Sequence, residues 1–340
     1  MKKRALITGI TGQDGAYLAK FLLSKNYDVF GMIPRRVNQS YSNLDFLQIT
    51  NKIKYVSGDI TDLCSVQNCV KSVRPMELYN LAAMSFVGAS WQQPVYTAEV
   101  NGIGVVNILE SVRNHAPECR VYQASTSEMY GNNWNEDLTQ NEETPFRPRS
   151  PYGSAKLFAH HTMINYRESY GIYAACGILF NHESPIRGKE FVTRKITDGV
   201  ARVKKGIDKR IELGNLDSRR DWGFAGDYVK AMWMMLQEPE GKSNEYVIAT
   251  GETWSIREFL DRAFSTVGIN SWEDYVYINP DFIRPAEVPH LKGDPTKANT
   301  ELGWKPETSF DTLVADMVLA DMIRYEGSYN GNQSRNLYYP

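Results

Sequence analysis

The sequence predicts an α/β protein in which a doubly wound parallel sheet is followed by a smaller α/β domain near the carboxyl terminus. Along the first half of the chain, short apolar runs alternate with helical patterns, as in consecutive βαβ units. The first apolar run, residues 4–8, passes through spaced glycines directly into a helical pattern at residues 16–23. That order of strand, turn and helix is typical of a Rossmann-type sheet, which we therefore predict as the core.

Composition limits the classes of protein to which the chain can belong. Its 340 residues favour one large or two interleaved domains. A net charge of −2 without long basic runs argues against nucleic-acid binding, and the four cysteines lack the spacing of a metal site. The apolar runs are too short for a membrane span or a signal sequence. We expect a cytoplasmic protein with no metal, no membrane contact and buried, reduced thiols.

Three glycines shape the turn after the first strand. Gly9 allows a tight turn, Gly12 lets the backbone approach a pyrophosphate, and Gly15 lets the helix and the strand pack closely. The amino terminus of the following helix would hold the phosphates. Because the motif lies inside a strand-to-helix switch, it predicts a dinucleotide site rather than an ordinary glycine-containing loop.

The ends of the next three strands indicate which dinucleotide binds. Arg35 and Arg36 follow the second strand, residues 28–33. An NAD site usually has an acidic residue here for the ribose 2′-hydroxyl, whereas arginines suit a 2′-phosphate. The third strand ends near Asp59, expected beside the adenine, and the fourth, residues 77–83, ends in small residues that a dinucleotide can pass. NADP is the predicted cofactor, and a solvated basic loop is the alternative reading of the arginines.

The stretch most informative about chemistry is residues 121–156. Residues 121–124 are typical of a short buried strand, and Thr126 and Glu128 follow almost directly. Because open parallel sheets bind ligands beyond the carboxyl ends of their strands, we expect chemistry at residues 125–128.

A helix should begin at Ser150, a good N-cap, with Pro151 as its first residue. Tyr152 then lies in the first turn, and Lys156 lies four residues later on the same face. A nearby cation lowers the pKa of a phenol from about 10, which makes Tyr152 a candidate general base. Alone, this pair is more often part of a helix surface, but its occurrence with Thr126 and the glycine turn favours a catalytic role.

The remaining elements are predicted from apolar periodicity. A Met-rich helix after residue 227 is expected to pack in the core through Met232, Met234 and Met235, and the tail after Gly327 to be mobile or dependent on oligomerisation. Strands are predicted at residues 172–179 and 246–249, and helices at residues 101–114, 150–170, 191–205, 253–267 and 310–323.

The residues described so far, with the run Gln-Ala-Ser-Thr-Ser-Glu-Met-Tyr-Gly that ends at Gly131, resemble the extended short-chain dehydrogenase/reductase superfamily. Within it, they are similar to the GDP-mannose 4,6-dehydratase family. Glu128 is the distinguishing residue, because a reductase or epimerase needs only Thr126, Tyr152 and Lys156, whereas a dehydratase also needs a base for the sugar C5 proton. Further similar segments cover nearly the whole chain, at residues 8–15, 181–185, 191–196, 214–217, 220–223, 284–287 and 304–306.

The resemblance implies an NADP-dependent lyase that converts GDP-mannose to the GDP-4-keto-6-deoxy sugar. The implied cycle oxidises C4, eliminates water across C5 and C6, and returns the hydride to C6. The resemblance also implies an NADP-binding domain at residues 1–180, with a returning segment near 220–250, interleaved with a nucleotide-sugar-binding domain at residues 181–340. A homodimer or homotetramer is the implied assembly.

Residue roles are carried over from the family by position. The implied catalytic residues are Thr126, Glu128, Tyr152 and Lys156. The implied cofactor contacts are Gly9, Thr11, Gly12, Gln13, Asp14, Gly15, Arg35, Arg36, Asp59, Ile60, Leu81, Ala82, Ala83, Ser85, Tyr96, Lys156, His182 and Arg187. The implied nucleotide-sugar contacts are Ser85, Asn181, Glu183, Lys195, Gly214, Asn215, Arg220, Arg284 and Glu287.

The chain departs from the family pattern at several positions near the implied site. Met84, Phe86 and Ile186 stand where family members usually carry Gln, His and Arg, and residues 37–39 replace a Ser-rich segment. A GDP-manno-heptose is therefore an alternative substrate. A reductase or epimerase acting on a GDP-4-keto-6-deoxy sugar is a second alternative, and an NADP-sensing protein without activity is a third.

Overall fold

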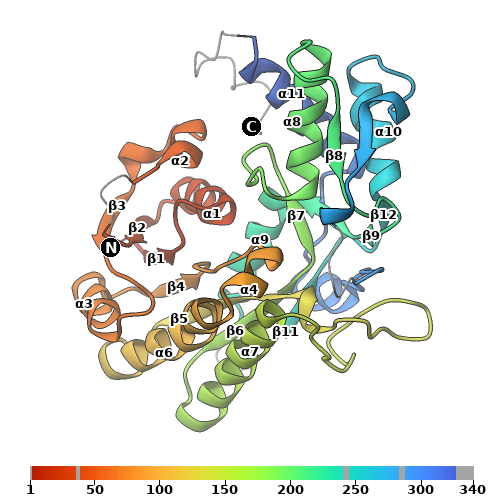
Figure 1. Cartoon of the computed structure of the whole chain (residues 1–340). Coiled ribbons are helices and arrows are strands. Elements are labelled where there is room, and N and C mark those ends of the chain that lie inside the picture. The colour runs from red at the N-terminus through yellow and green to blue at the C-terminus, as the bar shows by residue number, and fades with distance from the viewer. Residues whose placement is uncertain (1, 36–38, 240–244, 283–287, 327–340) are drawn as a thin grey trace.

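A seven-stranded, wholly parallel sheet runs through the centre of the molecule (Figure 1). The computed structural model describes residues 2–35, 39–239, 245–282 and 288–326. The strand order is β3-β2-β1-β4-β5-β6-β11, so the chain winds outward from β1 first in one direction and then in the other. The predicted doubly wound sheet is confirmed. Its strands are β1 (Arg4–Thr8), β2 (Asp28–Ile33), β3 (Lys54–Ser57), β4 (Glu77–Asn80), β5 (Arg120–Thr126), β6 (Ala174–Leu179) and β11 (Glu245–Ile248).

Helices cover both faces of this sheet, because its strands are apolar on both sides. In β1, Ala5 and Ile7 belong to one buried cluster, and Leu6 belongs to the other. The first cluster includes α1 (Gln13–Ser24) and α9 (Ala225–Met235), and the second includes α3 (Leu63–Val73), α6 (Gly104–His115) and α7 (Pro151–Tyr170). The predicted methionine stripe of α9 is confirmed as core, since Met232 and Met235 are buried and Met234 packs against them.

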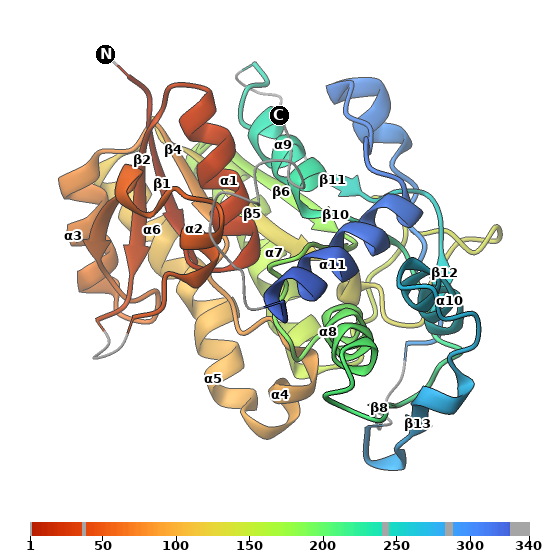
Figure 2. The ribbon, with the colours of Figure 1, turned by 90° about the horizontal axis from the view of Figure 1, so that it is seen from above.

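A smaller half of the molecule lies beside the sheet and has its own apolar core (Figure 2). In this half Trp222, Phe259 and Phe310 pack against one another. Its strands form three pairs, β7 with β10, β8 with β13, and β9 with β12. The elements are β7 (Asn181–Glu183), α8 (Val192–Lys204), β8 (Ile211–Leu213), β9 (Arg219–Arg220), β10 (Trp222–Phe224), β12 (Trp254–Ser255), α10 (Ile256–Thr266), β13 (Val276–Ile278) and α11 (Phe310–Arg324).

The chain crosses between the two halves more than once. After β10 it returns to the sheet as α9, which packs on α1, and as β11, which pairs with β6. It then leaves again for β12. The short helical segments are α2 (Ser42–Phe46), η1 (Thr50–Lys52), α4 (Val87–Gln92), α5 (Pro94–Ala98), η2 (Glu99–Ile103), η3 (Ser127–Met129), η4 (Glu273–Tyr275), η5 (Pro280–Phe282) and η6 (Ala298–Leu302).

Local signals place the start and end of α7 where the sequence predicts them. The Ser150 hydroxyl accepts a hydrogen bond from the Gly153 amide at 3.0 Å, and Pro151 is the first helical residue. Gly171 ends the helix with a φ of 68°. Ser255 likewise caps α10 through a capping box with Glu258.

Other boundaries differ from prediction. Strand β5 continues through Thr126, because all of its residues after Arg120 are buried and paired with β6. The helix predicted to begin at residue 101 is continuous with a π-helical segment that begins at Glu99. Within this segment Asn101 bonds both backbone groups of Met84, at 2.8 and 3.1 Å.

The expectation of buried thiols is correct for three cysteines and wrong for one. Cys64 is exposed, because the side chains of α3 that face the sheet are Val66, Cys69, Val70 and Val73, and position 64 lies off that stripe. Within the described ranges, no helix is long and apolar enough to cross a membrane, and no group of three His, Cys, Asp or Glu side chains could hold a metal ion. The tail from residue 327 lies outside the described residues.

Candidate active site

The turn between β1 and α1 requires glycine at two positions. Gly9 has a φ of 66°, and a Cβ there would lie 2.7 Å from the Leu81 carbonyl carbon. A Cβ on Gly15 would lie 2.4 Å from the Gly9 oxygen. Gly12 is the N-cap of α1, and no described side chain caps the helix there. Backbone amides at this end therefore stay available to an anion, which fits a dinucleotide pyrophosphate.

The first turn of α1 is fastened to β7 by buried hydrogen bonds. The Gln13 amide donates to the His182 carbonyl at 3.1 Å and accepts from the Ser184 hydroxyl at 2.7 Å. His182 Nε2 lies 2.7 Å from Asp14 Oδ2, and its ring stacks on Tyr228. These bonds connect three predicted cofactor residues, Gln13, Asp14 and His182, in one hydrogen-bonded network.

The Asp14–His182 contact is an ion pair when His182 is protonated. Burial by itself would lower the pKa of His182, but the Asp14 carboxylate outweighs that effect and raises the pKa above 6.5. Burial by itself would raise the pKa of Asp14, but the His182 charge and hydrogen bond outweigh it and lower the pKa below 3.8. Each partner thus stabilises the charged form of the other.

The loop after β4 lies against the glycine turn. The amides of Leu81 and Ala82 both donate to the Thr8 hydroxyl, at 3.1 and 3.0 Å. That hydroxyl donates in turn to the Asn80 side chain at 2.6 Å. These bonds fix the predicted cofactor residues of this loop, of which Leu81, Ala82 and Ala83 are half-buried and Ser85 is exposed.

Other predicted cofactor residues lie at neighbouring strand ends. Arg35 follows β2 and is exposed, and Asp59 follows β3 and accepts hydrogen bonds from the Thr61 amide and hydroxyl. Ile60 is buried, and Tyr96 on α5 is 43% exposed. Thr11 lies within the glycine turn, where its carbonyl accepts from the Asn43 side chain at 3.0 Å. Arg36 lies outside the described residues.

The four predicted catalytic residues come together at the carboxyl end of β5. The Thr126 hydroxyl is near enough to the Tyr152 phenol to lower its pKa, and it accepts a hydrogen bond from the Glu128 amide at 3.3 Å. The Glu128 carboxylate is near enough for its charge to act on the phenol. The Lys156 ammonium lies 5.9 Å from the centre of the Tyr152 ring and donates to the Ala124 carbonyl at 2.9 Å.

The expectation that Lys156 lowers the pKa of Tyr152 is wrong for this structure. Burial raises the pKa of Tyr152 to about 12, and the Glu128 charge adds to the rise, while the Thr126 hydrogen bond and the Arg187 charge oppose it. Burial also lowers the pKa of Lys156 to about 8. The lysine is itself desolvated and is directed at the Ala124 carbonyl, so it does not offset the burial of the phenol.

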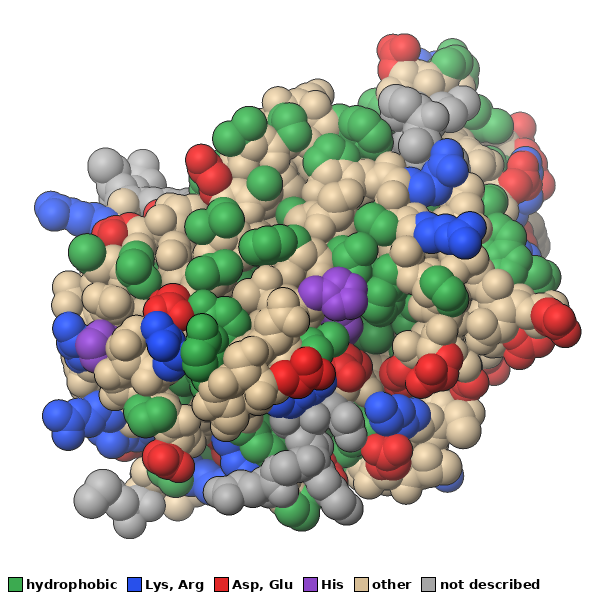
Figure 3. Space-filling model, turned by 90° about the horizontal axis from the view of Figure 1, so that it is seen from below, with side chains coloured by type: hydrophobic (Ala, Val, Ile, Leu, Met, Phe, Trp, Pro, Cys, Tyr) green, Lys and Arg blue, Asp and Glu red, His purple; other side chains and the backbone are tan. Residues whose placement is uncertain are grey.

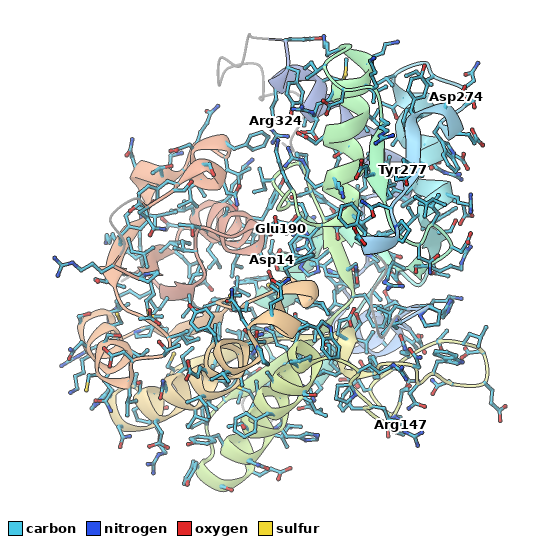
Figure 4. The ribbon with its side chains drawn as sticks, in the orientation of Figure 1. Asp14, Arg147, Glu190, Asp274, Tyr277 and Arg324 are labelled. Atoms are coloured by element: carbon cyan, nitrogen blue, oxygen red, sulfur yellow. The ribbon has the colours of Figure 1, made fainter. Side chains whose placement is uncertain are left out.

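A cavity of about 920 Å³ opens between the amino end of α1 and the loop that joins β7 to α8. Asp14, Glu190 and Arg324 project where the two halves of the molecule meet (Figure 4). Four predicted site residues line the cavity, namely Gly12, Gln13, Ser85 and Arg187. Its remaining walls are Ser42, Asn43, Asp45, Phe46, Ile186, Gly188, Lys189, Glu190, Phe191, Arg194 and Arg324.

Arg187 lies at the cavity wall between Glu183 and Phe191. Its guanidinium lies 3.6 Å from the centre of the Phe191 ring, and Nε lies 3.1 Å from Glu183 Oε2. The same Glu183 oxygen accepts from the Thr193 hydroxyl at 2.5 Å. Glu183 is thus buried among protein partners, and direct contact between Glu183 and a sugar stays a prediction.

The predicted nucleotide-sugar residues lie in the smaller half. The Lys195 ammonium lies 3.8 Å from the centre of the Phe282 ring, and a Cβ on Gly214 would lie 2.7 Å from the Phe282 carbonyl oxygen. Asn215 accepts from the Asp217 amide. Arg220 on β9 is buried and donates to the Arg219 carbonyl, and Asn181 on β7 is half-buried. Arg284 and Glu287 lie outside the described residues.

Several cavity residues were not predicted from the sequence. Arg194 belongs to the family-like segment 191–196, which could have indicated that it lies at the site. Asn43 and Phe46 belong to α2, which has only five residues, and Arg324 ends a helix far along the chain. Nothing local in the sequence places these three beside the glycine turn.

The fold and the site together define the class of protein. A glycine turn after β1, a Thr–Tyr pair with a lysine at β5 and α7, and an added α/β half are the features of the extended short-chain dehydrogenase/reductases. Solved structures agree on the fold. UDP-glucose 4-epimerase of Thermus thermophilus, in complex with NAD, matches with a TM-score of 0.81 at 25% identity, covering 94% of this chain and 99% of that one. The dTDP-glucose 4,6-dehydratase of Bacillus anthracis, also with NAD, matches with a TM-score of 0.82 at 21% identity, covering 96% and 98%.

The chain belongs to the GDP-mannose 4,6 dehydratase family, whose model matches residues 6–317. GDP-mannose 4,6 dehydratase 1 of Arabidopsis thaliana is 48% identical over 331 residues, which cover 94% of this chain and 90% of the relative. The Vibrio cholerae O1 enzyme is 46% identical, covering 94% of each chain, and the human enzyme is 45% identical, covering 94% and 91%.

Proposed function

We propose that this protein is a lyase that removes water from GDP-mannose and gives the GDP-4-keto-6-deoxy sugar. The observation that carries the proposal is the carboxylate of Glu128 beside the Thr126–Tyr152 pair. Transfer of a hydride to or from C4 needs only the tyrosine, threonine and lysine. The extra carboxylate is the group that elimination needs. The full-length similarity to GDP-mannose dehydratases supports the same substrate.

The proposed cofactor is NADP. Gly9, Gly12 and Gly15 leave room for a pyrophosphate, and exposed Arg35 follows β2, where a 2′-phosphate would lie. Bound NADP⁺ supplies the hydride acceptor for C4, the hydride donor for C6 and a positive charge that favours a phenolate. The acidic residue that selects NAD at this position is replaced by arginine.

Tyr152 acts in the first step. Its phenolate takes the proton of the 4-hydroxyl as the hydride leaves C4, and the Thr126 hydroxyl hydrogen-bonds the carbonyl oxygen that forms. The raised pKa of Tyr152 means that cationic charge must build up around it before it can act as a base. Within the protein, Arg187 supplies such a charge.

Glu128 acts in the second step. The C4 carbonyl makes the neighbouring C5 proton acidic, and the Glu128 carboxylate removes it. The protonated Glu128 then gives that proton to the departing 6-hydroxyl, which leaves as water and creates a C5–C6 double bond. After the hydride has been returned to C6, C5 takes up a proton from solvent and Tyr152 releases to solvent the proton that it took from the 4-hydroxyl, so protons balance and no net oxidation occurs.

The proposed assembly is a homodimer or a homotetramer, with one subunit contact formed through the face that carries α6 and α7. Figure 3 shows hydrophobic side chains spread across the underside of the molecule, the side on which these helices lie in Figure 1. Val95 is 70% exposed and Phe158 49% exposed, and Trp91, Ile103 and Tyr170 are also exposed. Light scattering should report a dimer or a tetramer for the protein and a shift to monomer for Phe158→Glu, and a monomeric wild type would contradict the proposal.

Mass spectrometry of the reaction products tests the function. Purified protein is incubated with GDP-mannose or with GDP-manno-heptose, with NADP and without NADPH. Loss of one water from GDP-mannose supports the proposal. Loss from the heptose alone keeps the mechanism but reassigns the substrate, and consumption of NADPH with a GDP-4-keto-6-deoxy sugar identifies a reductase. Binding of NADP with no turnover of any of these identifies a regulatory protein.

A further inference from the structure

Two arginines hydrogen-bond the backbone of the loop between β7 and α8. Arg194 Nη1 donates to the Arg187 carbonyl at 3.0 Å, and Arg324 Nη2 donates to the Pro185 carbonyl at 2.7 Å. The loop carries the Arg187 guanidinium at the cavity wall, so its backbone position determines where that charge lies.

One carboxylate holds both arginines. Asp321 of α11 is fully buried and forms a bidentate pair with Arg194, through Nε at 3.0 Å and through Nη2. It also accepts from Arg324 Nη1 at 2.6 Å and from the Thr197 hydroxyl at 2.8 Å. Because both guanidiniums use their remaining N–H groups on the loop, the carboxylate sets the direction of two charge-assisted bonds.

The side chain of Arg187 is held separately. Its guanidinium is paired with the Glu183 carboxylate at 3.1 Å and lies 3.6 Å from the centre of the Phe191 ring, while Arg194 and Arg324 hydrogen-bond the backbone of its loop. Arg324 also lies 5.1 Å from the centre of the Phe46 ring on α2, on another wall of the cavity. The carboxyl-terminal helix therefore links the smaller half to the sheet half at the point where a ligand would lie.

Stability alone does not account well for this arrangement. A buried ion pair often contributes little net free energy, because removing two charges from water offsets their attraction. Such a pair does fix the orientation of its side chains. Here the oriented guanidiniums donate to two carbonyls of the cavity-lining loop, those of Pro185 and Arg187. Thr197 joins the same carboxylate but is not bonded to the loop, so it offers an internal comparison.

We propose that Asp321 is a positioning residue that acts through Arg194 and Arg324 to hold the 185–187 backbone, and thereby presents the Arg187 guanidinium to a phosphate of the bound ligand. The inference rests on the proposed function in taking that ligand to be NADP. The phosphate-bearing ligand is recognised by charge, so its affinity should follow the position of Arg187.

The test measures the dissociation constant of NADP by calorimetry, without turnover, for Arg324→Gln, Arg324→Lys and Thr197→Val. Arg324→Gln should weaken NADP binding about tenfold, the effect of losing one charge-assisted hydrogen bond. Arg324→Lys keeps the charge but has one nitrogen in place of the two that bond Asp321 and Pro185, so it should not restore the affinity. Thr197→Val, the matched control, should bind NADP within about twofold of wild type, because it leaves the loop contacts intact.

Three outcomes would overturn the inference. One is a lowered Tm in every variant with unchanged NADP affinity, which would indicate a purely structural network. Another is full rescue by Arg324→Lys, which would indicate that Arg324 contacts the ligand by its own charge. The third is a wild-type protein that binds no NADP. Asp321→Asn should also weaken NADP binding. If this variant does not fold, the Arg324 and Thr197 variants still test the inference. A protein that binds NADP without dehydrating GDP-mannose would refute the proposed function and leave this test in force.

Discussion

Replacing Lys156 with Met should make the protein more stable and less active. The lysine is 4% exposed, and burial lowers its pKa from 10.5 to about 8. One pKa unit corresponds to about 1.4 kcal/mol, so the buried charge costs the folded state about 3 kcal/mol at neutral pH. Methionine has a similar unbranched shape and carries no charge.

The loss of the amine offsets part of this gain. Lys156 donates to the Ala124 carbonyl at 2.9 Å, and a hydrogen bond of this kind contributes about 1 kcal/mol. The carbonyl does not become unsatisfied, because the Gln123 side chain also donates to it at 2.9 Å. The net effect is a stabilisation of about 2 kcal/mol, or a rise of about 3 °C in Tm for a chain of this length.

The predicted sign of the stability difference between Lys156→Met and wild type can be checked by varying the pH. Below about pH 8 both the folded and the unfolded state hold the lysine proton, so the full penalty applies to wild type. Between about pH 8 and pH 10.5 the folded state has released the proton and wild type regains stability. The advantage of Lys156→Met should therefore shrink as the pH rises through this range.

Urea unfolding at about pH 7 and about pH 9, with product formation measured in parallel, is the assay. Dehydration should fall by at least about 100-fold, because the proposed hydride transfer at C4 uses Lys156 together with Thr126 and Tyr152. Lys71→Met on the exposed side of α3 is the matched control and should change neither stability nor activity. A Lys156→Met protein that is less stable than wild type at about pH 7 would refute the reasoning, because it would show that the charge is favourable where it lies.

Three other changes test separate parts of the site. Glu128→Gln should lower dehydration by about 10²- to 10⁴-fold with NADP affinity unchanged, and an active variant would assign the C5 proton to another base. Wild type should lose stability as the pH rises above 6.5 through the raised pKa of His182, because the charged Asp14 pair is lost, and His182→Asn should lose less. An equal loss for both proteins in urea titrations would show that the Asp14 pair contributes nothing to stability. Gly15→Ala should lower stability by about 1 to 3 kcal/mol and weaken NADP binding, since its Cβ would lie 2.4 Å from the Gly9 oxygen, and unchanged calorimetric values would contradict that crowding.

Much of the fold could be predicted because its signals are local. The glycine turn needs only Gly9, Gly12 and Gly15 in one short segment, and the start of α7 is set by Ser150 and Pro151. Each of these residues acts through its own backbone conformation or through a bond to a residue three positions away. Such effects follow from the sequence without knowledge of the tertiary structure.

The parts that could not be predicted depend on distant packing. The pKa of Tyr152 is set by burial, which comes from the whole of the surrounding structure and not from the lysine one turn away. Arg324 reaches the Pro185 carbonyl across 139 residues of sequence, and no periodicity indicates that contact. The sequence therefore predicted residues whose role depends on neighbouring positions in the chain. It did not predict the cavity walls that α2 and α11 contribute.

The central claim is that the hydride taken from C4 of the sugar is returned to C6 of the same molecule after water has left. GDP-mannose carrying deuterium at C4 tests it most directly, with the product examined by NMR and mass spectrometry in ordinary water. If the hydride is returned in this way, the product keeps the deuterium at C6 and forms without accumulation of NADPH. A product without deuterium, or a reaction that oxidises C4 and leaves the 6-hydroxyl in place, would contradict the account.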